Sequence, residues 1–227
     1  MRAWNSPCPF YFMPRFSHLI FDLDGTLVDT KADLAAATNH MLQELDLPLL
    51  SVSQVEDFIG LGARVLIKRA LGLDRAALVP HGFDIFMDYY TLHLLDQTRL
   101  YPGIEPLLDA ALDQKIHLSV LTNKPEQPTL AILSGLGIAK HFSAVIGGDT
   151  LQTRKPDPEG VFALQKIARR ALAQTVLIGD SGIDVETGRA AGIATCGVTW
   201  GFGQDGFAMH PPEFLLDTPE TLGELIL

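Results

Sequence analysis

Acidic side chains gather in two short segments of the sequence, each of which follows an apolar run. Asp22 and Asp24 follow the first run, and Asp180 and Asp184 follow a later one. Side chains two residues apart in an extended chain point to the same side, so Asp22 and Asp24 would lie close together. Carboxylates held close repel one another, and a divalent cation such as Mg²⁺, which prefers oxygen ligands, relieves that repulsion. The acids therefore predict a metal-assisted site.

Two further polar side chains suit an anionic substrate. Thr122 ends another apolar run and offers a hydroxyl donor, and Lys155 stands in a loop and offers a fixed positive charge. Both are typical partners of a phosphate group. No Ser–His or Cys–His pair accompanies them, so the nucleophile would be a carboxylate, which can form an acyl phosphate. These residue types predict phosphoryl transfer, in which Mg²⁺, Lys155 and backbone N–H groups offset the repulsion between two anions.

Five apolar runs predict the strands that would hold these groups together. Helical patterns at about 126–136, 158–172 and 182–191 separate several of them. Strands that alternate with helices, and that are apolar on both faces, are typical of an α/β fold with a parallel sheet. Ligands of such sheets bind at the carboxyl ends of the strands. The predicted strands are residues 18–21, 117–121, 144–146, 175–178 and 194–198.

One interval is too long for a single crossover. The chain from Asp22 to His117 is about three times longer than the ~30 residues of a βαβ unit. Apolar residues recur at helical spacing in 31–47, 62–71 and 83–96, which predicts an inserted helical domain. The predicted organisation is an irregular extension at 1–15, a core formed by 16–30 and 99–227, and a helical cap at 31–98.

Composition narrows the class of protein. The 227 residues include 17 Lys and Arg against 27 Asp and Glu, a net charge of −10, which argues against broad binding of nucleic acid. No apolar run reaches the ~18 residues of a membrane span. Two cysteines, Cys8 and Cys196, are typical of reduced thiols in a cytoplasmic protein. The natural start (Met1 or Met13) and the oligomeric state, monomer or homodimer, stay open.

Four motifs, in their order and spacing, resemble those of the haloacid dehalogenase superfamily. The similarity runs from about residue 16 to 200 and includes a helical region after the first motif. It implies a Rossmann-like, doubly wound core with a helical cap that closes over a small phosphate monoester. The motifs are Asp22-Leu-Asp-Gly-Thr-Leu-Val-Asp29, Leu121-Thr-Asn123, Lys155-Pro-Asp157 and Gly179-Asp-Ser-Gly-Ile-Asp184.

The resemblance also implies roles for single residues. Asp22 would be the nucleophile, and Asp24 the general acid and base that protonates the leaving oxygen and then activates water. Asp184 would be an outer partner of the metal ligand Asp180, and Asp24 would reach the metal through its backbone carbonyl. The implied Mg²⁺ set is Asp22, Asp24, Asp180 and Asp184. The implied phosphate-binding set is Thr122, Asn123 and Lys155.

Residues in and around the motifs restrict the reactions that the resemblance allows. By the same resemblance, Asp24 differs from the residue of the haloacid dehalogenases proper, which argues against carbon–halogen cleavage. Thr26 differs from the residue common in the sugar phosphomutases of the family, which favours a phosphatase. The segments 122–125, 101–103 and 154–158 resemble those of the phosphoglycolate phosphatase group, which implies 2-phosphoglycolate as the substrate.

The identity of the substrate also depends on the inserted helices. Arg64 is the candidate for reading the substrate's carboxylate, because a guanidinium binds a carboxylate through two hydrogen bonds. The alternatives are a phosphomutase similar to β-phosphoglucomutase, a phosphatase of sugar phosphates, nucleotides or pyrophosphate, and a regulatory module without activity.

Overall fold

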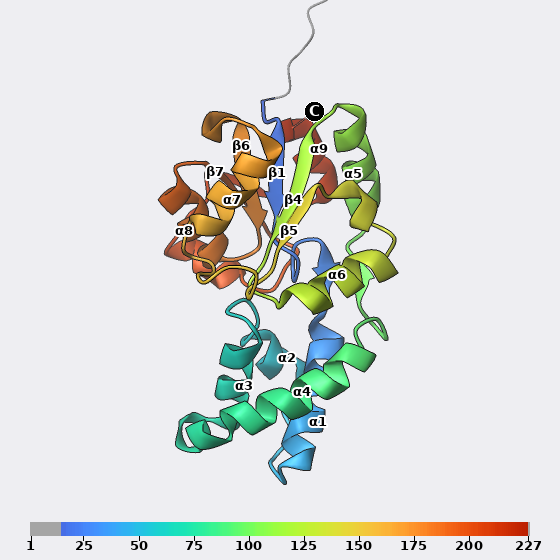
Figure 1. The fold of residues 1–227 in the computed structure, drawn as a ribbon, viewed down its shortest axis with the longest axis vertical. Coiled ribbons are helices and arrows are strands. Elements are labelled where there is room, and N and C mark those ends of the chain that lie inside the picture. The colour runs from blue at the N-terminus through green and yellow to red at the C-terminus, as the bar shows by residue number, and fades with distance from the viewer. Residues whose placement is uncertain (1–14, 227) are drawn as a thin grey trace, which may run out of the picture.

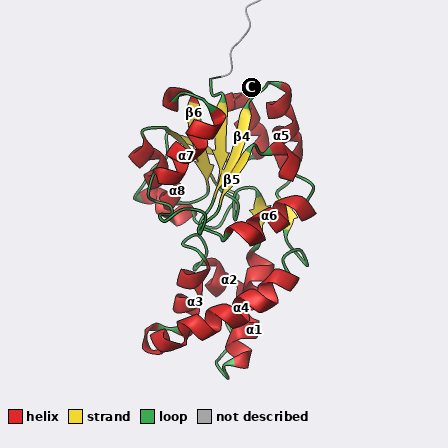
Figure 2. Ribbon diagram, viewed as in Figure 1, coloured by secondary structure: helices red, strands yellow, loops and turns green. Residues whose placement is uncertain are grey.

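A six-stranded sheet forms the centre of the computed structural model, which describes residues 15–226. All neighbouring strands are parallel, and Figure 2 shows them as one twisted layer. The predicted extension at 1–15, Cys8 and the two candidate start residues fall outside the described part, apart from Arg15. Across the sheet, the strands are β5 (Ala144–Ile146), β4 (His117–Leu121), β1 (His18–Phe21), β6 (Thr175–Gly179), β7 (Ala194–Val198) and β8 (Phe214–Leu216).

Helices cover both faces of the sheet, as strands that are apolar on both faces require (Figure 1). Leu19 and Phe21 pack in one cluster with residues of α5, α6 and α9, whereas Ile20 packs in another with residues of α7 and α8. The five helices are α5 (Ile104–Asp113), α6 (Glu126–Gly135), α7 (Glu159–Ala168), α8 (Gly182–Ala191) and α9 (Pro219–Ile226). Short 3₁₀ turns occupy Leu73–Leu78, Ala139–His141, Leu172–Gln174 and Gln204–Ala208. The predicted α/β class with a parallel sheet is confirmed.

Four more helices stand beyond the carboxyl ends of the strands (Figure 1). We call residues 31–98, which contain them, the helical insertion. They are α1 (Lys31–Glu44), α2 (Val52–Glu56), α3 (Ala63–Leu71) and α4 (Val79–Leu92). None of the helices within residues 15–226 is both long and apolar enough to cross a membrane.

The two linkers between the core and the helical insertion lie side by side. Strand β2 (Val28–Asp29) pairs antiparallel with β3 (Arg99–Leu100). The buried carboxylate of Asp33, in the first turn of α1, accepts hydrogen bonds from the backbone N–H groups of Gln97 and Thr98. The outgoing and returning chains are therefore joined at one narrow place.

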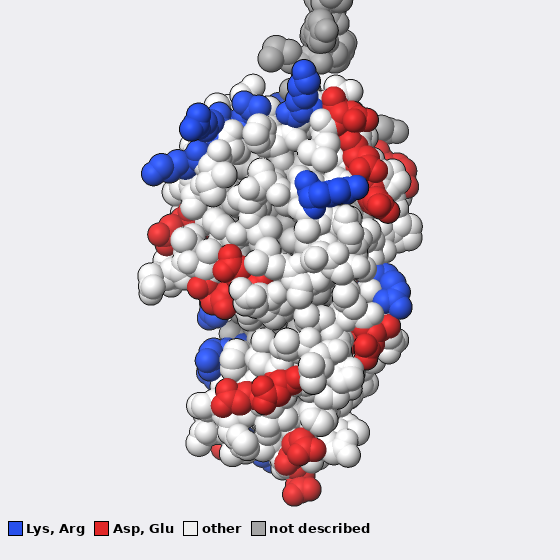
Figure 3. Space-filling model, turned by 45° about the vertical axis from the view of Figure 1, so that its right-hand side comes forward, with Lys and Arg blue, Asp and Glu red and all other residues white. Residues whose placement is uncertain are grey.

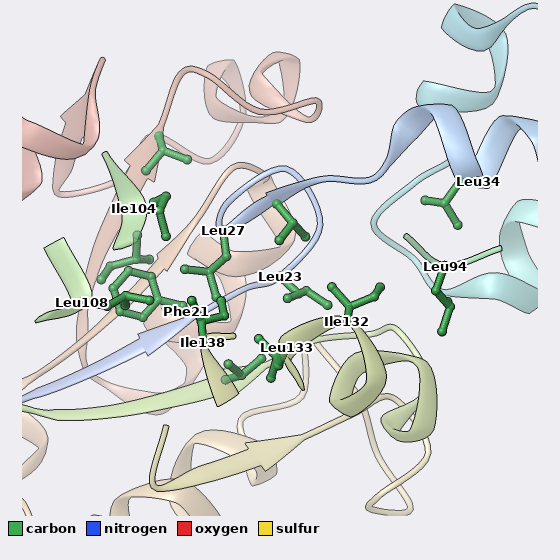
Figure 4. Close-up of a cluster of buried hydrophobic side chains, with 14 of the residues drawn as sticks. Phe21, Leu23, Leu27, Leu34, Leu94, Ile104, Leu108, Ile132, Leu133 and Ile138 are labelled. Atoms are coloured by element: carbon green, nitrogen blue, oxygen red, sulfur yellow. The ribbon is translucent and has the colours of Figure 1, made fainter. Parts of the chain in front are cut away.

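Buried hydrophobic side chains continue from the sheet into the helical insertion. Figure 4 shows Leu34 and Leu94 of the insertion beyond Leu23 and Ile132 of the core, and all four belong to one cluster. On the face in Figure 3, Lys and Arg side chains form separate small groups rather than one continuous basic area. The insertion thus rests on the carboxyl edge of the sheet through apolar contacts.

Several element boundaries differ from those that the sequence predicts. Helix α4 spans 79–92 instead of 83–96, since Pro80 is compatible with the first turn of a helix. Helix α7 ends at Ala168, before the predicted 172, because Arg169 adopts a left-handed conformation with φ of 52°. No sequence pattern predicts helices α2 and α5 or the two linker strands.

Candidate active site

The carboxyl ends of four neighbouring strands bring the predicted site residues together. Asp22 follows β1, Thr122 follows β4 and Asp180 follows β6. Lys155 comes from the loop after β5, and Asp184 lies in the first turn of α8. All five are at least nine-tenths buried. The sheet therefore assembles, at one edge, groups that lie far apart in the sequence.

Lys155 joins two of the acids. Its Nζ lies 2.9 Å from Asp22 Oδ1 and donates a 2.6 Å hydrogen bond to Asp184 Oδ1. Burial opposes the charged form of Lys155, but the carboxylates of Asp184 and Asp22 outweigh it and raise its pKa above the ordinary value. Lys155 therefore stays protonated and supplies a fixed positive charge beside the predicted nucleophile.

Three acids could hold a cation. Asp22, Asp180 and Asp184 each offer a carboxylate oxygen, and these oxygens lie within 4.8 Å of one another. Oδ2 of Asp180 accepts hydrogen bonds from the backbone N–H groups of Phe202 and Gly203, at 2.6 and 3.2 Å. These two N–H groups orient the carboxylate. Such an oxygen-only donor set fits a hard divalent cation.

The acidity of these groups supports the same conclusion. Burial raises the pKa of Asp22 to about 6; Lys155 opposes this rise, and the charges of Asp184 and Asp24 add to it. Burial, followed by the charges of Asp22 and Asp184, raises the pKa of Asp180 to about 8. The three buried carboxylates of Asp22, Asp180 and Asp184 share a single lysine, Lys155, which contacts two of them. The cluster therefore lacks positive charge, which a bound cation would supply.

Gly25 explains why the first motif needs a glycine. Its φ is 80°, and a Cβ at this position would overlap the carboxylate of Asp180. Only a residue without a side chain lets the loop after β1 turn this close to the end of β6. The glycine thus permits Asp22 and Asp180 to share one site.

Asp24 lies apart from the three clustered acids. Lys124 Nζ donates to both of its carboxylate oxygens, at 3.1 and 3.2 Å, and Thr30 Oγ1 donates to Oδ1 at 2.7 Å. Burial opposes the charge of Lys124, but Asp24 outweighs it and raises the pKa of the lysine above its ordinary value. No motif in the sequence assigns a role to Lys124. Its place directly after Thr122 and Asn123 was the signal that could have indicated one.

A narrow cavity, partly open to solvent, separates the edge of the sheet from the helical insertion. The space in it that the centre of a water molecule can reach is about 30 Å³. The core contributes mainly polar groups to its wall and the insertion mainly apolar ones. The lining residues are Asp22, Asp24, Thr122, Asn123, Lys124, Pro125 and Pro128 from the core, and Leu34, Ile59, Gly60, Gly62, Ala63, Leu66, Phe86, Met87 and Tyr90 from the insertion.

Two predicted residues occupy unexpected places. Asn123 Nδ2 donates to the backbone carbonyls of Gly60 and Lys155, so this side chain connects the core with the insertion. Its role in phosphate binding stays a prediction. Arg64 is exposed, with its guanidinium 4.0 Å from the ring centroid of Phe83, and it is absent from the cavity lining.

The doubly wound α/β core carries a buried carboxylate–lysine cluster at its strand ends, and the sequence that forms it is similar to that of known hydrolases. Residues 19–198 match the sequence profile of the haloacid dehalogenase-like hydrolases. The chain therefore belongs to the haloacid dehalogenase-like hydrolase family. The family predicted from the four motifs is thus confirmed.

Individual relatives agree with this assignment. A phosphoglycolate phosphatase of Pseudomonas syringae pv. syringae is 37% identical over 190 residues, covering 81% of this chain and 70% of its own length. One from Agrobacterium fabrum is 35% identical over 202 residues, covering 87% of both chains. A solved structure, described as a predicted phosphoglycolate phosphatase from Haemophilus somnus, has a TM-score of 0.88 and 32% identity, and covers 94% of this chain and 99% of its own.

Proposed function

We propose that this chain is a phosphatase that hydrolyses 2-phosphoglycolate to glycolate and phosphate through a phosphorylated Asp22. The observation that carries the proposal is the pair of Asp22 and Lys155 beside a narrow, partly open cavity that has Asp22 and Asp24 in its wall. The relatives named phosphoglycolate phosphatase support the choice of substrate. Free phosphate as the product distinguishes this activity from that of a phosphomutase.

Each residue of the site has a separate role in the proposed reaction. Asp22, with a pKa of about 6, is largely ionised at neutral pH and can attack phosphorus. Lys155 and the hydroxyl of Thr122 hold the phosphoryl oxygens as charge develops on them. Asp24, oriented by Thr30 and Lys124, gives a proton to the leaving oxygen and later takes one from the attacking water.

Mg²⁺ is the cofactor that these residues fit. Asp22 and Asp180 would hold it, Asp184 would support it from outside, and Asp24 would contribute its backbone carbonyl. The bound ion would supply positive charge that neutralises the substrate's phosphate. The raised pKa values of Asp22 and Asp180 support a cation at this place.

Residues 31–98 would act as a cap over a core formed by 16–30 and 99–226. The paired linkers β2 and β3 give the insertion one narrow attachment, about which it can rotate. Opening would admit the substrate, and closing would exclude water from the phosphorylated intermediate. The Asn123–Gly60 hydrogen bond supports the closed arrangement.

Phosphate release from 2-phosphoglycolate tests the proposal. The purified chain should turn over this substrate, lose activity in EDTA and regain it with Mg²⁺. Asp22→Asn should lower kcat by about 10⁴-fold or more, because the nucleophile is lost. Asp113→Asn, at the exposed end of α5, is the matched control. Wild-type turnover by Asp22→Asn would contradict the nucleophile assignment, and isomerised sugar phosphate as the product would favour a phosphomutase.

A further inference from the structure

We propose that Lys124 and Tyr90 recognise the carboxylate of the substrate's leaving group and thereby select phosphate esters of short 2-hydroxy acids. This inference rests on the proposed phosphatase function and identifies two specificity-determining residues for it. One residue comes from the core loop after β4 and the other from α4 of the helical insertion. The recognition site is therefore complete only when the two parts meet.

Lys124 has the charge and the position that this role needs. Among the described residues that line the cavity, it is the one cation. Its Nζ lies within 3.2 Å of both carboxylate oxygens of Asp24. Asp24 faces the leaving oxygen when it acts as the acid, so Lys124 lies on the leaving-group side of the phosphate. An ammonium group has three donors and can bind a second carboxylate beside Asp24.

Tyr90 places a hydroxyl in the cavity wall, next to Lys124. The side chain is 2% exposed, and its hydroxyl makes no hydrogen bond of good geometry. Burial raises the pKa of Tyr90 to about 12, so the hydroxyl keeps its proton at neutral pH. Lys124 Nζ lies 4.7 Å from the centroid of the same ring. Lys124 can only donate to this hydroxyl, so the hydroxyl's own proton has no acceptor among the described residues. A buried donor without an acceptor is unfavourable, and its place in the cavity wall indicates a ligand oxygen nearby.

The length of the substrate follows from this arrangement. In 2-phosphoglycolate, the carboxylate is attached to the carbon that carries the ester oxygen. A cation that touches Asp24 can therefore reach this carboxylate while Asp24 reaches the ester oxygen. In 3-phosphoglycerate, the acid group stands one carbon further away, and the two contacts compete. The geometry thus favours a carboxylate next to the ester carbon.

The remaining wall excludes more polar leaving groups. Leu34, Leu66 and Phe86 lie on the side of the insertion and offer no hydrogen-bonding side-chain atoms. A sugar hydroxyl placed against them would lose its hydrogen bonds to water without replacement. Sugar phosphates and nucleotides are therefore disfavoured by the same cavity that accepts a short acid.

A comparison of two substrates tests the inference. Ethyl phosphate resembles 2-phosphoglycolate but has a methyl group in place of the carboxylate. In wild type, kcat/KM should favour 2-phosphoglycolate by about 100-fold. In Lys124→Met this ratio should fall by at least about 30-fold, because a buried charge partner is removed. In Tyr90→Phe, which removes a single hydroxyl, it should fall by about tenfold. The ratio is insensitive to partial misfolding, which lowers both rates equally.

The controls distinguish the possible outcomes. Lys68→Met, on the exposed side of α3, is the matched lysine variant and should leave the ratio unchanged. Equal losses on both substrates in Lys124→Met would show that this lysine serves Asp24 alone, and would overturn the inference. Wild-type preference for ethyl phosphate or 3-phosphoglycerate would also overturn it, although phosphatase activity would stand. A wild-type chain that hydrolyses none of these esters would instead contradict the proposed function.

Discussion

The two ends of the cavity are built in different ways. The nucleophile end has Asp22 in the cavity wall, beside a cluster formed by Lys155, Asp180 and Asp184, all from the core. The charges of this end are in contact with one another or with backbone N–H groups. The leaving-group end combines Asp24 and Lys124 of the core with side chains of the helical insertion. The difference implies that the insertion can change the choice of substrate while the phosphoryl chemistry remains the same.

The largest expected effect separates the two lysines. Lys155→Met should lower kcat/KM by about 10³-fold, since it removes positive charge at the transferring phosphoryl group. The loss should be equal for 2-phosphoglycolate and ethyl phosphate, whose phosphates are identical. Steady-state kinetics with both substrates measures it, with Lys166→Met on the exposed side of α7 as the matched variant. A loss confined to 2-phosphoglycolate would show that Lys155 recognises the carboxylate as well, so that the two ends would not be separate in function.

The nucleophile end should also respond to pH and to Mg²⁺. The pKa of Asp180 is raised to about 8 from an ordinary 3.8, so the folded chain holds this proton more tightly than the unfolded chain does. The free energy of unfolding of the metal-free chain should therefore fall as pH rises from about 4 to about 8. Because Mg²⁺ offsets the repulsion, it should raise Tm more at about pH 8 than at about pH 5.

Asp180→Asn isolates this contribution. The variant no longer titrates at this position, so its Tm should depend less on pH and should rise less with Mg²⁺. Differential scanning calorimetry of both proteins, with and without the ion, provides the measurement. If wild type instead gains stability over the same pH range without metal, and Asp180→Asn does not, the raised pKa of Asp180 is wrong.

The sequence was sufficient to predict the nucleophile end. Strands β1, β4 and β6 are apolar runs that are each followed directly by a polar residue, and strands of one parallel sheet end at the same edge. The positions of Asp22, Thr122 and Asp180 therefore follow from the pattern alone. Whether their oxygens approach closely enough to share a cation depends on backbone details such as the positive φ of Gly25.

The leaving-group end could not be predicted in the same way. Lys124 resembles an ordinary loop lysine until its partners are known, and these partners are Asp24, far earlier in the chain, and Tyr90 on an inserted helix. Contacts between the insertion and the core depend on how two separately patterned parts dock. Strands β2 and β3, with two residues each, are also too short to show an alternating pattern.

Two glycines of the helical insertion test whether its contact with the core is needed for substrate binding. Gly62 has a φ of 90°, and a Cβ there would lie 2.9 Å from the backbone oxygen of Asn123. Gly60 has a similar φ of 106°, but a Cβ would meet nothing within 4 Å. Alanine at either position strains the backbone, because both glycines have a positive φ. Only Gly62→Ala also obstructs the contact between the insertion and the core. Gly62→Ala should therefore raise KM for 2-phosphoglycolate by about fivefold more than Gly60→Ala does. Equal KM values in the two variants would show that closure does not need this contact.

Arg64 provides the smallest expected effect and the sharpest contrast with Lys124. The sequence predicts that Arg64 reads the carboxylate, yet α3 directs Leu66, Ile67 and Leu71 inward and leaves Arg64 exposed. Its guanidinium already contacts the ring of Phe83, outside the cavity. Arg64→Ala should therefore change kcat/KM for 2-phosphoglycolate by less than about twofold, as expected for an exposed charge.

Kinetics with 2-phosphoglycolate and ethyl phosphate also show whether Arg64 or Lys124 binds the carboxylate. A selective rise in KM for 2-phosphoglycolate in Arg64→Ala, with ethyl phosphate unaffected, would mean that the insertion closes further than in this structure and brings Arg64 to the carboxylate. In that case, the double variant with Lys124→Met should show losses that are not additive, because both cations would contact the same group. If Arg64→Ala is silent and the double variant matches Lys124→Met alone, the carboxylate is read from the core, and the insertion contributes the hydroxyl of Tyr90 and the apolar wall.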